Sequence, residues 1–368
     1  MSEPAVSRGR GAVSNPAGRF ERLAVVADSE ADGAAPSAVP TLFLRDSSRS
    51  VVSRNDSPDV PFGHSLNPYR GCEHGCVYCY ARPTHEYLGF SLGLDFETRI
   101  LVKEDAPEQL RDELRRRTWR PTLLALSGVT DPYQPVERTL RLTRRCLEVL
   151  ADCRQPVGLV TKSGMVTRDI DVLRELARHH TVQVAISVTS LDEGLRAALE
   201  PRAPTAEVRL DAIARLNEAG IPAGVMVAPV IPGLTDHEVP AILSRAAEAG
   251  ARFAGYTMLR LPHGLAPLFE QWLAVHRPDR QQRVWSRIRD VRGGAVSDTR
   301  FGTRMKGVGV CADLVADLFR GARRRADIPA APPPLSMAAF RRPATSAPLL
   351  AHLHEAESHA CPADRRPA

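Results

Sequence analysis

Short apolar runs alternate with longer amphipathic segments through the middle of the chain, while both ends lack such a pattern. The apolar runs have the length of strands, and we expect six of them near residues 65–67, 122–128, 157–162, 183–189, 223–230 and 255–261. Helical spacing appears at about 105–117, 136–152, 168–179, 205–219 and 237–249. This alternation predicts an α/β fold with a parallel sheet, and six βα repeats fit a partial (β/α)6 barrel.

The same pattern divides the chain into four parts. Residues 1–45 are rich in Ala, Ser, Gly and Pro, and we expect a disordered N-terminal tail. Residues 46–264 hold the barrel, and residues 265–325 are predicted to add a helical C-terminal extension. Residues 326–368 are predicted to be a Pro/Ala-rich disordered tail, because eight prolines among the last forty residues are too many for a packed core.

Composition narrows the class of protein. Hydrophobic residues make up 43% and charged residues 25% of the chain, which is ordinary for a globular protein. No apolar stretch approaches the ~18 residues that span a bilayer, so we expect no membrane partner and a cytoplasmic location. The net charge is only +6, but arginines cluster at 115–117 and 120, at 144–145 and at 323–325. Such clusters contact phosphates or form solvated helix faces.

Three cysteines within eight residues, in the run C-E-H-G-C-V-Y-C, carry the strongest chemical signal: Cys72, Cys76 and Cys79. Three thiolates on one loop can hold three irons of a cubane cluster and leave the fourth iron open. A structural zinc site needs four ligands, usually from two cysteine pairs, and a ferredoxin cluster needs a fourth cysteine. The other four cysteines are scattered. His74 and His85 flank the loop and keep zinc as an alternative.

The C-x3-C-x2-C spacing, with Tyr78 before the third cysteine, resembles the cluster motif of the radical S-adenosylmethionine (SAM) enzymes. Residues 62–90 look like the branch related to spore photoproduct lyase, often labelled DNA repair photolyase, and the resemblance extends over about residues 55–325. It implies a [4Fe-4S] cluster on Cys72, Cys76 and Cys79, with SAM on the open iron. It further implies cleavage of SAM to a 5′-deoxyadenosyl radical that abstracts a substrate hydrogen, and an electron donor such as flavodoxin or ferredoxin.

The carboxyl ends of barrel strands are where functional groups gather. Ser127, Gly128 and Thr130 follow the second strand at the position of the Gly-rich motif that holds the SAM amino group in the family. The sequence S-G-V-T-D stands there in place of G-G-E. We expect these three residues to contact SAM, with Asp131 as a weaker candidate whose alternative role is a helix cap.

Later strand ends supply further candidates for SAM binding. Ser187 and Thr189 alternate on one face of the fourth strand, and their hydroxyls suit a ribose. Arg202 is a candidate partner for the SAM carboxylate, with a salt bridge inside its own loop as the alternative. The backbone near Val230 resembles the turn that reads adenine in this superfamily. Lys162, after the third strand, places a cation at the barrel mouth.

The group that receives the radical is not assigned by the sequence. No cysteine falls at a strand end, and the apolar neighbours of Cys146 on its predicted helix indicate burial. Tyr80, Tyr87 and Tyr133 are candidate hydrogen relays. Residues 298–307 mix cations with an aromatic and glycines, which is typical of a nucleic-acid contact or of a loop that caps the barrel.

Two classes of function therefore stand. One is a radical SAM enzyme that acts on a nucleic acid in the manner of spore photoproduct lyase, with RNA, a peptide or a small metabolite as alternative substrates. The other is a non-enzymatic nucleic-acid-binding protein in which the cysteine loop holds zinc or an iron–sulfur cluster.

Overall fold

The computed structural model describes residues 9–20 and 39–343. Its main sheet has seven strands in the order β10-β9-β8-β7-β6-β3-β2. Pairing is parallel from β3 through β10, and β2 pairs antiparallel with β3. The strands are β2 (Val52–Arg54), β3 (His64–Leu66), β6 (Leu124–Leu126), β7 (Val157–Thr161), β8 (Val182–Ser187), β9 (Ala223–Val230) and β10 (Ala254–Met258).

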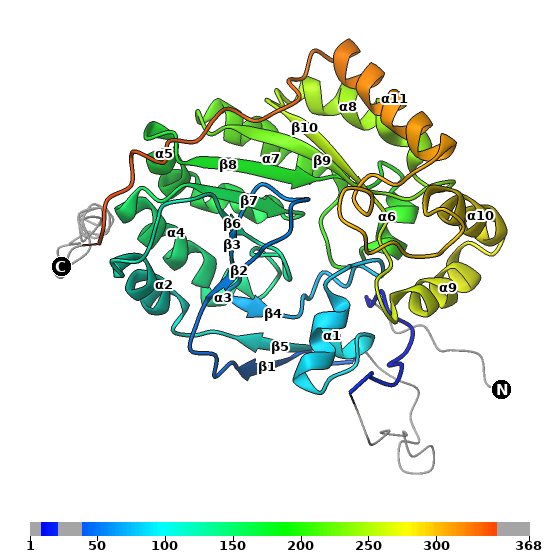
Figure 1. The fold of residues 1–368 in the computed structure, drawn as a ribbon, viewed down its shortest axis with the longest axis horizontal. Helices are drawn as coiled ribbons and strands as arrows, with labels where there is room; N and C mark the ends of the chain where they lie inside the picture. The colour runs from blue at the N-terminus through cyan, green and yellow to red at the C-terminus, as the bar shows by residue number, and fades with distance from the viewer. Residues whose placement is uncertain (1–8, 21–38, 344–368) are drawn as a thin grey trace, which may run out of the picture.

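The expected α/β fold is confirmed, since the six predicted strands are the six that run parallel. In the described part of the chain β10 and β2 are edge strands that do not pair with each other, so the barrel is partial. The arrowhead of β8 in Figure 1 points toward α6 (Glu193–Leu199), α9 (Leu265–His276) and α10 (Gln281–Val291). The carboxyl ends of the strands therefore lie on that side.

Helices connect the strands and cover the outer face of the sheet (Figure 1). The predicted helix at 136–152 is broken at Arg141, whose φ of 50° is left-handed and interrupts the helix. Thr205 caps its helix by accepting a hydrogen bond from Val208 N. The helices are α2 (Ala106–Arg115), α3 (Glu137–Leu140), α4 (Leu142–Cys153), η2 (Gly164–Asp169), α5 (Ile170–Arg178), α7 (Ala206–Glu218), η3 (Asp236–Glu238) and α8 (Val239–Glu248).

The largest apolar core lies between the sheet and these helices. Leu147 and Leu150 of α4 pack there with Val184 and Ile186 of β8, and all four side chains are fully buried. Cys146 is buried in the same core, as its helical position predicts. No helix in the described ranges has the length and apolar content that a membrane crossing requires.

Part of the predicted N-terminal tail packs against the domain, which corrects the expectation for the described residues of 1–45. Strand β1 (Leu42–Arg45) pairs with β5 (Arg99–Val102), which also pairs with β4 (Tyr69–Arg70) in a small second sheet. Upstream of it, Gly11 N and Ala12 N donate to the carboxylate of Glu97. A low-complexity composition did not reveal these contacts because they are made by backbone groups.

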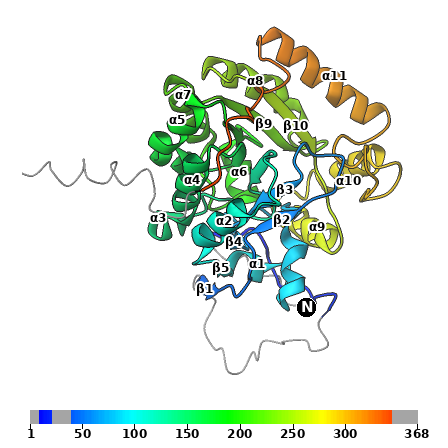
Figure 2. The same cartoon turned by 60° about the vertical axis from the view of Figure 1, so that its left-hand side comes forward.

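The segment after the barrel is helical, as expected. It contains α9, α10 and α11 (Val310–Arg325), and Figure 2 shows α11 beside α8 at the outer end of the sheet. Between α10 and α11 the loop 298–307 bridges the two open edges of the barrel. Met258 N, at the end of β10, donates to Met305 O, and Gly302 N donates to Asp59, which follows β2.

The described residues of the predicted C-terminal tail also differ from expectation. Ser336 N donates to His180 O, just after α5, and Arg341 N donates to Cys153 O, the last residue of α4. Carbonyls at helix C-termini have no partner within the helix, so residues 329–343 satisfy them while running across the barrel, as the red trace in Figure 1 shows. Residues 344–368 lie outside the described part.

Candidate functional site

The cysteine loop follows β4 and is fixed by backbone hydrogen bonds on both sides. Cys72 N donates to Phe96 O (2.9 Å), and Val77 N donates to Leu199 O at the end of α6 (3.1 Å). Gly75 has a φ of 68°, and a Cβ there would lie 2.7 Å from a carboxylate oxygen of Glu97. The loop therefore requires glycine at this position.

A fully buried ion pair anchors the loop from behind. The Arg82 guanidinium lies 2.5 Å from the carboxylate of Glu97, and both side chains are 0% exposed. Arg82 also donates to the carbonyls of Gly75 (3.2 Å) and Cys76 (2.9 Å). Because the carboxylate also accepts from Gly11 N and Ala12 N, one charge pair joins the cysteine loop to the N-terminal segment. We call residues 10–16 the N-terminal strap.

The three thiols are brought together but are electrostatically unfavourable as bare thiolates. Burial raises the pKa of Cys72, Cys76 and Cys79, and the nearby charge of Asp131 and of the other two cysteines raises that of Cys72 further. Thiolate ligands need positive charge to be stable here. A donor set of three soft thiols on one loop fits an iron–sulfur cluster.

The two histidines of the zinc alternative both lie beside protein groups. In the described part of the chain no three His, Cys, Asp or Glu side chains converge on one point as a single metal ion requires. A cubane cluster does not require such convergence, because each thiolate binds a different iron. His85 packs against Phe90 and Phe96, and its Nε2 lies 2.9 Å from Arg99 O. His74 Nδ1 lies 3.3 Å from Asp131 Oδ2.

The loop after β6 holds the first group of predicted SAM contacts. Ser127 and Gly128 have φ near 140°, and the Ser127 hydroxyl donates to Thr130 O. The buried hydroxyl of Thr130 donates to Gly71 O (2.7 Å), so this side chain supports the cysteine loop. Its role in SAM binding stays a prediction, as do those of Ser127 and Gly128.

Asp131 connects three segments at this edge. It accepts from the Thr161 hydroxyl (2.6 Å) and from Lys162 N (2.8 Å), both at the end of β7, and it faces His74. Burial alone would raise the pKa of Asp131, but His74 and these hydrogen bonds hold it below its ordinary value. Asp131 is therefore a structural link between loops.

Sequence reasoning missed a buried network beneath the barrel mouth, centred on Glu200. Its carboxylate accepts hydrogen bonds from the Tyr78 hydroxyl and from Arg209, and lies 3.4 Å from Lys162 Nζ. Burial would raise the pKa of Glu200, but Arg209 and Lys162 more than offset this and keep it low. No local pattern singles out Glu200, because its partners come from distant parts of the chain.

Thr189 belongs to the same network, which brings it near the cysteine loop. Its hydroxyl lies 3.1 Å from the Tyr78 hydroxyl and 3.4 Å from Lys162 Nζ, and it donates to Ala228 O. Ser187 lies two residues before Thr189 and is buried. Its carbonyl oxygen accepts a hydrogen bond from the guanidinium of Arg209. The hydroxyls of Ser187 and Thr189 lie at the carboxyl edge of the sheet, as expected. Their contact with the ribose of SAM stays a prediction.

Arg202 and Val230 have protein partners in the structure. The Arg202 guanidinium lies 3.0 Å from Glu73 of the cysteine loop, so its salt bridge joins two loops and is not the one expected inside its own loop. Val230 is buried at the end of β9, and its carbonyl accepts from Leu259 N. Neither arrangement tests the predicted SAM contacts.

The candidate hydrogen relays are widely separated. Tyr133 is fully buried, and its hydroxyl donates to Asp169 in the core. Tyr87 is 70% exposed on the surface. Tyr80 is the one of the three at the barrel mouth, where its hydroxyl donates to Gly128 O and the guanidinium of Arg260 lies over its ring.

Comparison with known proteins agrees with this geometry. Residues 66–246 match the family model described as the radical SAM superfamily. This part of the chain belongs to the radical SAM superfamily. Its members use a [4Fe-4S] cluster and SAM, the cofactors expected from the cysteine motif, and membership implies an enzyme.

Among curated relatives, an uncharacterized protein of Mycobacterium tuberculosis is 40% identical over 222 residues. The match covers 60% of this chain and 65% of the relative, so this chain spans less than two thirds of that protein. The radical SAM Nalpha-GlyT isomerase of Pseudomonas phage M6 is 28% identical over 174 residues, which cover 46% of this chain and 34% of the isomerase.

Solved structures of spore photoproduct lyase share the fold. The complex of that enzyme with dinucleoside spore photoproduct has a TM-score of 0.54 and 17% sequence identity, covering 77% of this chain and 78% of that chain. A mutant with bound AdoMet has a TM-score of 0.51 and the same identity. The radical SAM domain therefore has the barrel fold that its sequence predicts.

Replacing Glu97 tests the anchor of the cysteine loop. In Glu97→Gln the buried guanidinium of Arg82 loses its counter-charge, and we expect a loss of about 3–5 kcal/mol of stability. Urea unfolding of anaerobically prepared protein measures this. The control is Glu207→Gln, which breaks an exposed ion pair with Arg245 and should change little. Equal shifts in the two variants would contradict the anchor role.

His85 gives the fold a pH dependence. Burial lowers its pKa from 6.5 to about 4, so the folded state keeps it neutral while the unfolded state binds a proton below pH 6.5. Its contribution of about 3 kcal/mol is present above pH 6.5 and is lost as the pH falls toward 4. Urea unfolding between pH 7 and 4.5 should show a shallower pH dependence for His85→Gln than for the wild type. Parallel profiles would contradict this assignment.

Proposed function

We propose that this chain is a radical SAM enzyme whose Cys72, Cys76 and Cys79 bind three irons of a [4Fe-4S] cluster. When bound, the cluster supplies one electron that cleaves SAM to methionine and a 5′-deoxyadenosyl radical, which abstracts a substrate hydrogen. The observation that carries this proposal is the position of three thiols on one anchored loop, two buried and that of Cys79 half-buried, at the carboxyl edge of six parallel strands.

The chain's own residues divide into those that hold SAM and those that hold the loop. Lys162 and Thr189 lie together at the mouth, and we assign them to the carboxylate and ribose of SAM, with Ser187 beside them. We assign the backbone of Ser127 and Gly128, after β6, to the amino group of SAM. We assign the backbone near Val230 to the adenine of SAM. Thr130 and Arg202 support these contacts by positioning the cysteine loop, through Gly71 and Glu73.

For the substrate we propose a nucleic acid. Two exposed aromatic rings at the mouth support this: Tyr80 is 48% and Phe301 57% exposed. Each has an arginine over its face, Arg260 and Arg304. Exposed aromatic rings stack on bases, and arginine adds cation–π contact.

The remaining partners follow from the same proposal. The enzyme requires an electron donor, for which a flavodoxin or ferredoxin is suited, and a reducing compartment such as the cytoplasm. Such a location fits free thiols, and six cysteines in the described part of the chain are free.

Cys76→Ala tests the cluster assignment. Loss of one thiolate should lower the iron content and abolish 5′-deoxyadenosine formation by dithionite-reduced protein after anaerobic reconstitution. Cys146→Ala is the matched control, because this thiol is buried in the outer core of the barrel. Wild-type yields of 5′-deoxyadenosine from Cys76→Ala, or stoichiometric zinc with almost no iron in the wild type, would refute the proposal.

Binding to single-stranded DNA or RNA tests the substrate class. Phosphate contacts release counterions, so log K should fall with log salt by about 0.7 for each phosphate neutralised on a single strand. Fluorescence anisotropy of labelled oligonucleotides at several salt concentrations measures this slope. Absence of binding at low salt would contradict a nucleic-acid substrate and favour a peptide or a small metabolite.

A further inference from the structure

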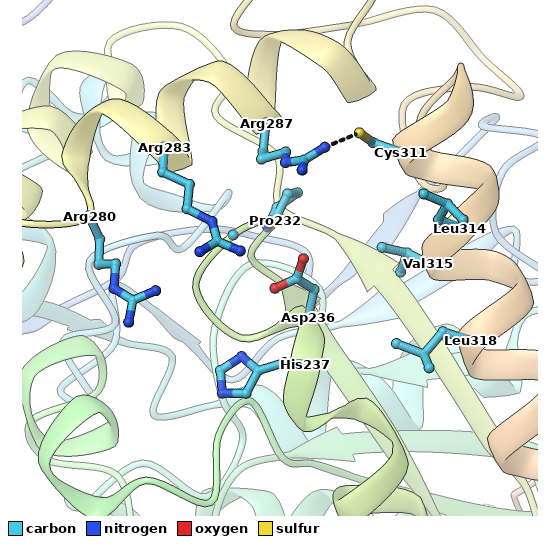
Figure 3. Close-up of a pocket in the computed structure, with 11 residues that line it drawn as sticks. Pro232, Asp236, His237, Arg280, Arg283, Arg287, Cys311, Leu314, Val315 and Leu318 are labelled. Carbon is cyan, nitrogen blue, oxygen red and sulfur yellow. Dashed lines mark hydrogen bonds between the residues drawn. The ribbon is translucent and has the colours of Figure 1, made fainter.

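A cavity of about 390 Å³ opens between α10, α11 and the turn after β9 (Figure 3). We call it the α10 pocket. One wall carries three arginines from α10 and the residue before it, and the other wall is apolar and belongs to α11: Arg280, Arg283 and Arg287 face Leu314, Val315 and Leu318. A cavity of this size holds a small ligand or a group of a larger one.

The charge in the α10 pocket is unbalanced. The guanidinium of Arg283 forms no hydrogen bond or ion pair with any described residue. Arg287 donates to Cys311 Sγ (2.8 Å) and lies 3.9 Å from Asp290, while Arg280 meets only its neighbour Asp279 at the surface. Asp236 is the one carboxylate among the described residues that line the pocket. Because Asp279 and Asp290 pair with Arg280 and Arg287, the charge without a partner is that of Arg283, and it favours an anionic ligand.

The α10 pocket lies on the same edge of the barrel as the candidate site. Its residues Pro232 and Gly233 lie two and three positions after Val230, the last residue of β9. The turn continues into Leu234, which packs in the apolar cluster that includes Cys76. Trp285, on the other face of α10, belongs to that cluster too. One face of α10 therefore packs on the apolar cluster beside the cysteine loop, and its other face lines the pocket.

We propose that the α10 pocket binds phosphate groups of a nucleic acid whose reacting residue occupies the barrel. This inference rests on the proposed nucleic-acid substrate. Guanidinium forms paired hydrogen bonds with phosphate. From Arg280 to Arg287 the helix rises about 10 Å, the axial length of about three phosphates in one strand of duplex DNA. An acidic electron-donor protein is the competing occupant, but its flat interface matches a hollow of this kind less well.

The double variant Arg283→Gln/Arg287→Gln tests the pocket. Its salt slope for a single-stranded oligonucleotide should be smaller than that of the wild type by about 1.4, since two phosphate contacts are lost. The control, Arg289→Gln, changes an exposed arginine of the same helix that does not line the pocket, and it should keep the wild-type slope. An unchanged slope in the double variant overturns the proposal.

Cys311 gives an independent readout, because its thiol is half-buried in the pocket wall. A bound oligonucleotide should slow the alkylation of Cys311 by iodoacetamide, and the double variant should lose this protection. Mass spectrometry of the peptide that contains Cys311 measures the extent of alkylation. Equal protection by inorganic phosphate at the same ionic strength would indicate a free phosphate ligand and overturn the nucleic-acid assignment. No protection by either would overturn the site.

SAM cleavage separates this proposal from the proposed function. With dithionite as reductant, the double variant should form 5′-deoxyadenosine at the wild-type rate, because the cysteine loop is untouched. If the wild type itself forms none, the proposed function fails, whatever the binding results. If the double variant keeps oligonucleotide binding but loses only flavodoxin-driven cleavage, the α10 pocket is a donor-docking site and the phosphate proposal is wrong.

Discussion

The buried pair of Arg82 and Glu97 is the constraint on which the cysteine loop depends. Two charges withdrawn from water are tolerated only when nearly every donor and acceptor is satisfied, and this pair meets that condition with backbone groups. Arg82 donates to carbonyls on both sides of the loop, and Glu97 accepts from the N-terminal strap. The pair thus converts a short glycine-containing loop into a rigid support. It also explains why the strap belongs to the domain.

A second buried carboxylate holds the loop from the barrel side. Glu200 accepts from the hydroxyl of Tyr78, which lies between the second and third cysteines, and is neutralised by Arg209 and Lys162. With both sides fixed, the thiols stay close together, where burial and the charge of neighbouring groups raise their pKa values. The positive charge of bound irons would stabilise the thiolates. The charge pairs therefore hold the loop in place for its metal.

The sequence predicted what local pattern determines and missed what distant partners determine. Strands such as Val182–Ser187 are mostly apolar and mostly buried, so their position follows from composition and length. The cysteine motif is equally local. Glu97 and Glu200 look like ordinary surface residues in sequence, because their burial depends on Arg82 and Arg209. Strand β1 was missed because its partner, β5, lies more than fifty residues away.

The arginines show the same limit of sequence-based prediction, and here the limit affects the prediction of function. Runs in the sequence suggested phosphate contacts, yet four of those nine arginines pair with acids on their own or adjacent helices, as Arg116 does with Glu113 and Arg145 with Glu108. Positive charge that is already neutralised offers little to a phosphate. Arg283 and Arg287 are spaced four residues apart and form no run, but helical geometry places them on one face. Charge available for binding is therefore set by pairing and periodicity, and neither is visible in a count of adjacent basic residues.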